Sequence, residues 1–374
     1  MTDLLWPGDE RAADLFSGAA VLHALARVEW AWLAAQGVEA DLAGLLDPAD
    51  VAVVARASEA GGNPVIPLLA LLRDRLGGTP AAAALHRGLT SQDTLDTALV
   101  LLLGDVLARL RAEIGGQVAA LTRLAAEHRD TPRAGRTLTQ PAVPITFGLT
   151  VAAWLGGVLD AADRLPAGLP AQFGGAAGNL AGPHAAGAGL VERAAEVLGL
   201  PVAPPWHTRR APFTGAGDAF TGCTDAWGHI ANDVLTGSRP EIGELREAAG
   251  GGSSAMPQKH NPVLSVLIRR AALANPPLAA TLHAAAADQS DERAAGAWHV
   301  EWATLRTLAR RTVVAGSQTT ELLAGLRVDP VRMAANLAAA RPGVDAERAR
   351  LGGAYAGAEP AIVAAVLRRA ETWS

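Results

Sequence analysis

The chain has 374 residues, a net charge of −5 at neutral pH and one cysteine, Cys223. This length allows a large core with two or three domains, and the charge provides no basic surface for nucleic acid. The single cysteine excludes an internal disulfide framework and fits a reducing compartment. No signal peptide is visible, and the long uncharged stretch of residues 141–159 contains prolines and glycines and is marginal for spanning a bilayer. We therefore expect a cytoplasmic protein that binds neither nucleic acid nor membrane.

The composition favours helices. Half of the residues are hydrophobic and 4% are aromatic, and alanine and leucine supply most of the apolar content. Alternating runs of valine, isoleucine and threonine are almost absent, so we expect an all-α fold without a real sheet. The clearest helix near the start is VLHALARVEWAWLAAQG, residues 21–37. Residues 1–89 are predicted to form an N-terminal helical domain.

Five long helices are predicted after this domain. The first covers residues 93–128, where apolar residues recur every three or four positions on one face, and TSQD before it is typical of a helix start. The others cover residues 145–164, 218–235, 261–287 and 292–326. Together they predict a central five-helix bundle over residues 90–328, followed by a short helical cap over residues 329–374.

Two of these helices carry further information. Segments 145–164 and 261–287 are apolar nearly all round, so they must be covered by the rest of the chain or by other subunits. A homo-oligomer with a shared helical core is the simplest solution. Pro276 and Pro277 lie inside the second segment and should kink or break the helix there.

The segment GGGSSAMPQKHNP, residues 250–262, precedes the second of these helices. A glycine–serine linker would not need its Met-Pro, its lysine or its Asn-Pro. The glycines can place backbone N–H groups around Ser253, while Lys259 and the helix start near Asn261 add positive charge. These groups would stabilise a serine alkoxide, so Ser253 needs no neighbouring His–Asp pair to act as a base. We expect a catalytic loop over residues 249–261.

This loop closely resembles the signature loop of the fumarase/aspartase superfamily, G-S-S-x-M-P-x-K-x-N-P. Two further segments resemble the other two characteristic regions of the superfamily, in the right order. They are HRGLTSQDTLDTALV from His86 and GRTLTQPAVPITFG from Gly135. The resemblance covers nearly the whole chain. It implies a three-domain all-α fold in which four five-helix bundles form the core of a homotetramer, with each active site built from three subunits.

The second region suggests a reaction. Superfamily lyases that expel water, ammonia, a guanidinium or an amine carry a histidine in the pattern G-R-T-H-x-Q, because these poor leaving groups need a proton. This chain has Leu138 there, which cannot donate one. A carboxylate leaving group departs unaided near neutral pH, since its conjugate acid has a pKa of about 4.

Four further segments resemble 3-carboxy-cis,cis-muconate cycloisomerases: residues 144–161, 169–181, 205–210 and 291–302. We therefore predict an isomerase that reversibly lactonises 3-carboxy-cis,cis-muconate in the protocatechuate branch of the β-ketoadipate pathway. The alternatives are an amine or guanidinium lyase, such as argininosuccinate or adenylosuccinate lyase, and a catalytically inactive helical scaffold.

The resemblance also implies roles for individual residues. Ser253 is the general acid/base that moves a proton at the carbon next to a substrate carboxylate. The residues implied to bind the tricarboxylate substrate are His86, Thr90, Ser91, Thr137, Gln140, Lys259, Asn261 and Arg293. We expect no cofactor and no metal, because the nine histidines form no metal-binding pair with a helical acid.

Some of these residues have structural alternatives. Arg293 is equally consistent with a surface arginine paired with Glu292 or Glu301, and His86 with a satisfied structural histidine. His260 is better explained as a helix-start residue than as a catalyst. The neighbouring pair Trp298–His299 is explained by packing as well as by chemistry.

Overall fold

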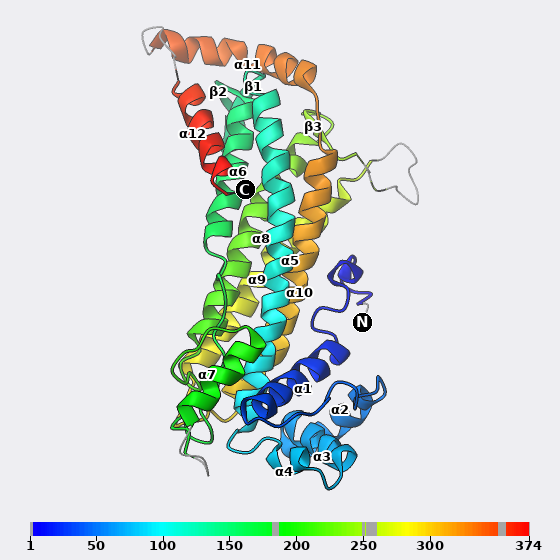
Figure 1. Cartoon of the computed structure of the whole chain (residues 1–374). Coiled ribbons are helices and arrows are strands. Elements are labelled where there is room, and N and C mark those ends of the chain that lie inside the picture. Colours follow the sequence, from blue (N-terminus) through cyan, green and yellow to red (C-terminus); the bar gives the residue numbers. More distant parts are fainter. Residues whose placement is uncertain (1–2, 182–186, 249–250, 252–259, 351–356, 374) are drawn as a thin grey trace. The chain divides into compact units, whose positions relative to one another are not determined.

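The computed structural model describes residues 3–181, 187–248, 251, 260–350 and 357–373 (Figure 1). It is mainly helical. The short first helix η1 (Asp9–Ala12) is followed by α1 (Gly18–Ala35), α2 (Asp50–Gly61), α3 (Val65–Leu76), α4 (Pro80–Ala84), α5 (Ser91–Glu127), α6 (Phe147–Asp163), α7 (Gly187–Leu198), α8 (Ala211–Gly237), α9 (Val263–Ala287), α10 (Ala297–Gly325), α11 (Pro330–Arg350) and α12 (Glu359–Glu371). The five predicted long helices are confirmed as α5, α6, α8, α9 and α10.

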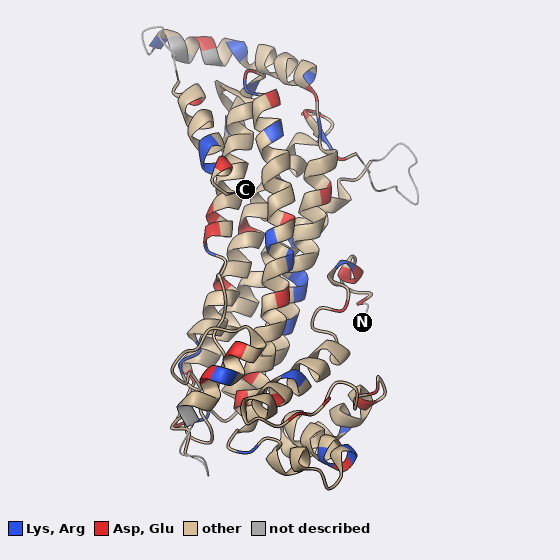
Figure 2. Cartoon of the chain, in the orientation of Figure 1, with Lys and Arg blue, Asp and Glu red and all other residues tan. Residues whose placement is uncertain are grey.

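The chain divides into two compact units, and several long helices contribute to both. Unit 1 contains Met1–Ala108, Pro166–Asp218 and Pro277–Arg311, and unit 2 contains Arg109–Leu165, Ala219–Pro276 and Thr312–Ser374. This division follows contacts rather than chain order, so the three-domain division made from the sequence stays a prediction. Charged side chains are sparse along most of the long helices (Figure 2), as expected for elements that bury apolar faces.

Unit 1 is organised around α1. Ser17 caps this helix by accepting a hydrogen bond from the Ala20 N–H at 3.0 Å. One side of α1 contacts α7, and Trp32 on α1 stacks on Phe173 with ring centroids 5.4 Å apart. The indole N–H of Trp32 donates to the Arg87 carbonyl oxygen at 2.9 Å. The segment that leads into α5 is thereby fixed to the core of this unit.

Unit 2 is cross-linked by buried polar side chains. The indole N–H of Trp227 on α8 donates to Gln117 on α5 at 2.7 Å, and Gln117 donates to the Gly316 carbonyl of α10 at 3.0 Å. The amide of Asn275 donates to the Thr312 hydroxyl at 3.0 Å. Figure 1 also shows α12 beside α6 and α11 beside a β-hairpin, and these elements are in contact.

Two short two-stranded sheets correct the expectation of no sheet. Strand β1 (Pro132–Thr137) pairs antiparallel with β2 (Gln140–Thr146), and β3 (Leu245–Arg246) pairs with β4 (Arg327–Val328). The β1–β2 turn consists of Leu138 and Thr139, which both have positive φ, at 48° and 73°. Glycine and asparagine favour such a turn, so its sequence gives no hairpin signal.

The prolines of α9 do not break the helix as expected. The helix is continuous from Val263 to Ala287 through Pro276 and Pro277. Both prolines are exposed, and neighbouring Asn275 is buried and bonded to Thr312. Tertiary packing around Asn275 therefore outweighs the loss of about 3 kcal/mol that an interior proline typically costs a helix. No described helix is both long enough and apolar enough to cross a membrane.

Candidate active site

The ends of the signature loop are held together by a pair of backbone hydrogen bonds. Gly251 N–H donates to the Asn261 carbonyl at 2.9 Å, and Asn261 N–H donates to the Gly251 carbonyl at 3.0 Å. A Cβ at position 251 would lie 2.1 Å from Cγ2 of Val263, so any larger residue would require the Val263 side chain to shift. Ser253 and Lys259, the predicted base and its cation, lie outside the described residues, as do the neighbouring glycines 250 and 252.

The start of α9 is capped by Glu247, which is 3% exposed. Its carboxylate accepts hydrogen bonds from the N–H groups of Leu264 and Ser265, at 3.1 and 2.8 Å, and from the Ser265 hydroxyl at 2.7 Å. The sequence suggested that this helix start would act on an anion at the loop. Instead, two of its first amides already bind a carboxylate of the chain itself.

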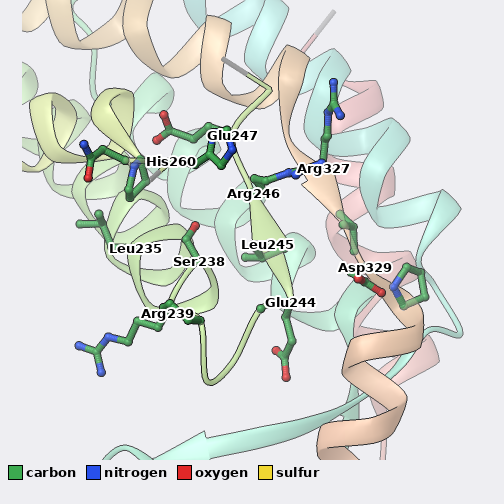
Figure 3. Close-up of a pocket in the computed structure, with 16 residues that line it drawn as sticks. Leu235, Ser238, Arg239, Glu244, Leu245, Arg246, Glu247, His260, Arg327 and Asp329 are labelled. Carbon is green, nitrogen blue, oxygen red and sulfur yellow. The ribbon is translucent and has the colours of Figure 1, made fainter. Parts of the chain in front are cut away.

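A cavity of about 850 Å³ lies beside the neck of the loop (Figure 3). Its lining includes Asn261, the exposed His260, and Glu247, and the paired strands β3 and β4 add Arg246 and Arg327. Guanidinium groups and an amide beside a glycine-rich neck suit a carboxylate ligand. The cavity lies within unit 2.

Glu244, at the edge of this cavity, connects it to the second predicted region. Arg136 on β1 donates both terminal nitrogens to Glu244, at 2.6 and 3.0 Å, and Asn336 donates to the same carboxylate at 2.8 Å. Burial raises the pKa of Glu244, but the hydrogen bonds from Arg136 and Asn336 outweigh it, so this pKa lies below its usual value. Glu244 is therefore a charged anchor for the hairpin.

The predicted residues Thr137 and Gln140 face each other at the tip of this hairpin and are exposed. Between them, Leu138 is 95% exposed. Positive φ at both Leu138 and Thr139 is costly for side chains other than glycine. Strain of this kind is retained mainly at functional positions, which agrees with a role for the tip.

The first predicted region is assembled at the start of α5. The Thr90 N–H donates to the Asp93 carboxylate at 3.0 Å, and Ser91 is the first residue of the helix. The exposed Arg293 donates to the Thr90 hydroxyl and to the Ala176 carbonyl. The Thr90 hydroxyl and a guanidinium thus meet at a helix start, an arrangement that suits an anion.

Asp93 is a buried residue of this region that was not predicted. Its carboxylate accepts from the N–H groups of Gly174 and Gly175, at 2.7 and 3.0 Å, and lies 3.1 Å from Nε2 of His207. The glycine-rich segment 169–181 is thereby anchored to the start of α5. Asp93 was visible only as part of the TSQD helix-start pattern.

A buried arginine next to the start of α8 contacts α5 one turn after Asp93. Arg210 pairs with Asp96 at 2.7 Å and with Glu301 at 2.6 Å, and the three side chains are at most 1% exposed. Burial lowers the pKa of Arg210, but the charges and hydrogen bonds of the two acids more than offset this and raise it. Because Glu301 is bonded to Arg210, the predicted alternative pairing of Glu301 with Arg293 is wrong.

The predicted histidines have different surroundings. Nδ1 of His86 lies 2.7 Å from the buried Glu29 carboxylate. His260 is exposed at the cavity. Trp298 is buried and donates to Asp96 at 2.9 Å, which supports its structural interpretation, and His299 packs against its ring. No group of three or more potential metal ligands occurs among the described residues.

The predicted residues thus form two sets. His86, Thr90, Ser91 and Arg293 belong to unit 1, whereas Thr137, Gln140 and Asn261 belong to unit 2. Within unit 1, Thr90 and Arg293 are in direct contact, and His86 lies four residues before Thr90 in the sequence. Within unit 2, Thr137 and Gln140 pair with each other, and Asn261 closes the loop neck.

A helix start with a hydroxyl beside a guanidinium in unit 1, and a loop neck beside an arginine-lined cavity in unit 2, are each suited to binding carboxylates. The chain belongs to the fumarase/aspartase superfamily: the model of the family described as Lyase matches residues 56–274. It is 44% identical to a nitrosuccinate lyase of Streptomyces davaonensis over an alignment of 348 residues that covers 86% of this chain and 73% of that protein.

Other relatives are cycloisomerases. The chain is 39% identical to a 3-carboxy-cis,cis-muconate cycloisomerase of Bradyrhizobium diazoefficiens, over 77% of this chain and 66% of that protein, just under two thirds of its length. The crystal structure of the 3-carboxy-cis,cis-muconate lactonizing enzyme from Pseudomonas putida superimposes with a TM-score of 0.84 and 29% identity, over 97% of both chains. The all-α fold and the superfamily predicted from the sequence are confirmed.

Proposed function

We propose that the chain catalyses an elimination in which the leaving group departs as a stable anion, without a proton from the enzyme. Leu138 carries this proposal. It is the residue at the tip of the second region, where superfamily members that expel poor leaving groups have a histidine. A leucine side chain has no proton to give, whatever its surroundings.

Nitrosuccinate is the substrate that fits best. Nitrite is the anion of an acid about as strong as a carboxylic acid, so it leaves unprotonated near neutral pH. The greater identity and coverage of the nitrosuccinate lyase, 44% over 86% of this chain, favour this substrate over the lactonisation predicted from the sequence.

In the proposed reaction Ser253, as an alkoxide, removes a proton from the carbon next to a carboxylate. The electron pair left on carbon is held as an aci-carboxylate, which Lys259 and Asn261 stabilise. The pair then forms the double bond while the C–N bond breaks, and nitrite takes the bonding electrons. The products are fumarate and nitrite, and the proton passes from Ser253 to water.

The remaining predicted residues bind and orient the substrate in this proposal. Thr90, Ser91 and Arg293 hold the second carboxylate, using the contacts already present at the start of α5. Thr137 and Gln140 approach from the strained hairpin tip. We propose a homotetramer in which subunits share each site, as the resemblance to the superfamily implies.

Exposed apolar side chains on α9 agree with this assembly. Val266 is 52% exposed and Leu273 is 69% exposed, and their seven-residue spacing places them on the same face of the helix. Burial of this face by other subunits would satisfy the expectation that segment 261–287 is covered on all sides. The proposed compartment is the cytoplasm.

Lactonisation of 3-carboxy-cis,cis-muconate is the second candidate. It is favoured by the superposition on the Pseudomonas putida lactonizing enzyme over 97% of both chains. The chemistry is of the same kind, because opening the lactone releases a carboxylate that needs no proton. An amine or guanidinium lyase lacks this support, since its leaving group would need the acid that Leu138 replaces.

A substrate panel tests the proposal. Purified protein is incubated with nitrosuccinate, 3-carboxy-cis,cis-muconate, argininosuccinate and adenylosuccinate, and nitrite, muconate absorbance and fumarate are measured. We expect nitrite and fumarate in equal amounts from nitrosuccinate, and loss of at least 100-fold in kcat for Ser253→Ala. Turnover confined to either succinate conjugate would refute the proposal, and an inactive wild type would favour the scaffold alternative.

A further inference from the structure

Glu29 is a fully buried carboxylate that takes no part in the proposed reaction. It lies on α1, and its side chain is 0% exposed. Its Oε1 accepts a hydrogen bond from the Thr94 hydroxyl at 2.7 Å and lies 2.7 Å from Nδ1 of His86. Oε2 has no hydrogen-bond partner within the described part of the chain. Because burying a carboxylate is costly unless it is paired, its value to the protein lies in these two contacts.

His86 has an unusual backbone conformation. Its φ is 61°, a region that few residues other than glycine adopt. An ionised carboxylate can only accept hydrogen bonds, so the proton between Glu29 and His86 resides on Nδ1. Among the described residues Nε2 has no partner, and the imidazole remains 14% exposed. The ring thus has one nitrogen fixed to the core and the other available.

The available nitrogen belongs to the same assembly as the predicted carboxylate-binding residues. Thr94, the second partner of Glu29, lies one turn after Thr90 on α5 and donates its backbone N–H to the Thr90 carbonyl at 3.4 Å. Its hydroxyl is 3.5 Å from Nδ1 of His86. Arg293 contacts the Thr90 hydroxyl. Glu29 therefore fixes the imidazole and the first turn of α5 relative to each other.

We propose that Glu29 is a positioning residue for His86, whose Nε2–H donates a hydrogen bond to an anionic oxygen of the substrate beside Thr90 and Ser91. With the substrate bound, both ring nitrogens donate, so the imidazole carries positive charge between two anions. The buried carboxylate stabilises this state. The ligand class is a dicarboxylate, and the identity of the reaction rests on the proposed function.

Two conservative variants test this role. Glu29→Gln keeps an oxygen that can accept from Nδ1–H but removes the negative charge. His86→Asn removes the imidazole, and asparagine tolerates positive φ better than most residues. The exposed Glu39→Gln on the same N-terminal part of the chain is the matched control. Each variant is compared with the wild type in kcat and KM for nitrosuccinate, in fumarate binding by calorimetry, and in Tm.

We expect Glu29→Gln and His86→Asn each to raise KM and the Kd for fumarate about tenfold, the loss of one charge-assisted hydrogen bond. The KM and Kd of the double variant should be no higher than those of the single variant with the larger loss, because both changes remove the same interaction. Unchanged KM and Kd in either single variant, or additive losses in the double variant, would overturn the proposal. So would an effect confined to Tm, which is the signature of a structural role.

The fumarate measurement separates this inference from the proposed reaction. If the wild type binds fumarate tenfold better than Glu29→Gln but releases no nitrite, the positioning role stands and the proposed reaction is wrong. If nitrite is released but the variants bind fumarate like the wild type, the proposed reaction stands and the positioning role is wrong. A wild type that binds neither fumarate nor nitrosuccinate overturns both.

Discussion

Removing the buried Arg210 should strongly destabilise the chain. Its side chain is 0% exposed and pairs with Asp96 and Glu301, and its guanidinium lies over the rings of Trp206 and Phe213, 4.9 and 4.8 Å from their centroids. Arg210→Met keeps much of the apolar contact but leaves two buried carboxylates without a positive charge. Breaking such a pair typically costs about 3–5 kcal/mol, equivalent to a fall in Tm of roughly 4–6 °C in a chain of this size.

The pH dependence of this loss checks its cause. Burial raises the pKa of Glu301 and Arg210 opposes this shift, so without Arg210 the folded-state pKa of Glu301 lies further above its unfolded value near 4. The penalty is therefore largest at neutral pH and shrinks as the pH falls and Glu301 takes up a proton. Thermal unfolding of Arg210→Met is compared with that of the exposed neighbour Arg209→Met from pH 8 to pH 5. A loss below about 1 kcal/mol, or one that is constant across this range, would refute the reasoning.

Three other expectations concern single residues. Burial raises the pKa of Cys223 to about 12, so iodoacetamide at pH 8 should alkylate it only after unfolding in urea. Alkylation is measured by mass spectrometry, and rapid labelling of the native protein would contradict this expectation. Leu138→His should leave nitrosuccinate turnover within about threefold of the wild type, because nitrite takes no proton; a tenfold gain in kcat would argue that the leaving group does need one. Glu244→Gln should destabilise the chain by about 2 kcal/mol at pH 7. Because the pKa of Glu244 is lowered in the folded state, its stabilisation is complete above about pH 4.5 and is lost as the pH falls through the folded-state value. The free energies of unfolding of the two proteins should therefore converge in acid. A difference that persists undiminished at pH 3 would contradict this.

The helices could be predicted because their signals are local. Apolar residues at spacings of three and four define α5, and the observed helix, Ser91–Glu127, begins within the predicted TSQD pattern and ends one residue before the predicted limit. The β1–β2 hairpin could not be predicted, since Leu138 and Thr139 occupy its turn in place of the usual glycine or asparagine. Pro276 and Pro277 led to the wrong prediction of a helix break. The helix is continuous there, and the neighbouring Asn275 is bonded to Thr312 in the core.

The candidate site residues that lie in recognisable sequence motifs could be named from the sequence. Gly251 and Asn261 both lie in the predicted loop and pair through their backbones, and Thr90 and Arg293, both predicted to bind substrate, come together across 203 positions of sequence. The buried acids that support these residues were missed. Asp93 and Glu247 bond to partners 81 and 18 residues away. Neither periodicity nor motif spacing predicts such pairs, because they come into contact only in the folded core.

The central claim is that the leaving group departs without a proton from the enzyme. The most direct measurement compares nitrosuccinate with aspartate, which carries an ammonium group at the same carbon. Purified enzyme is assayed at equal concentrations of each, with fumarate as the common product and nitrite or ammonia as the second. The account predicts rapid, equal release of nitrite and fumarate from nitrosuccinate and no detectable ammonia from aspartate. Ammonia released at a rate similar to that of nitrite would contradict it.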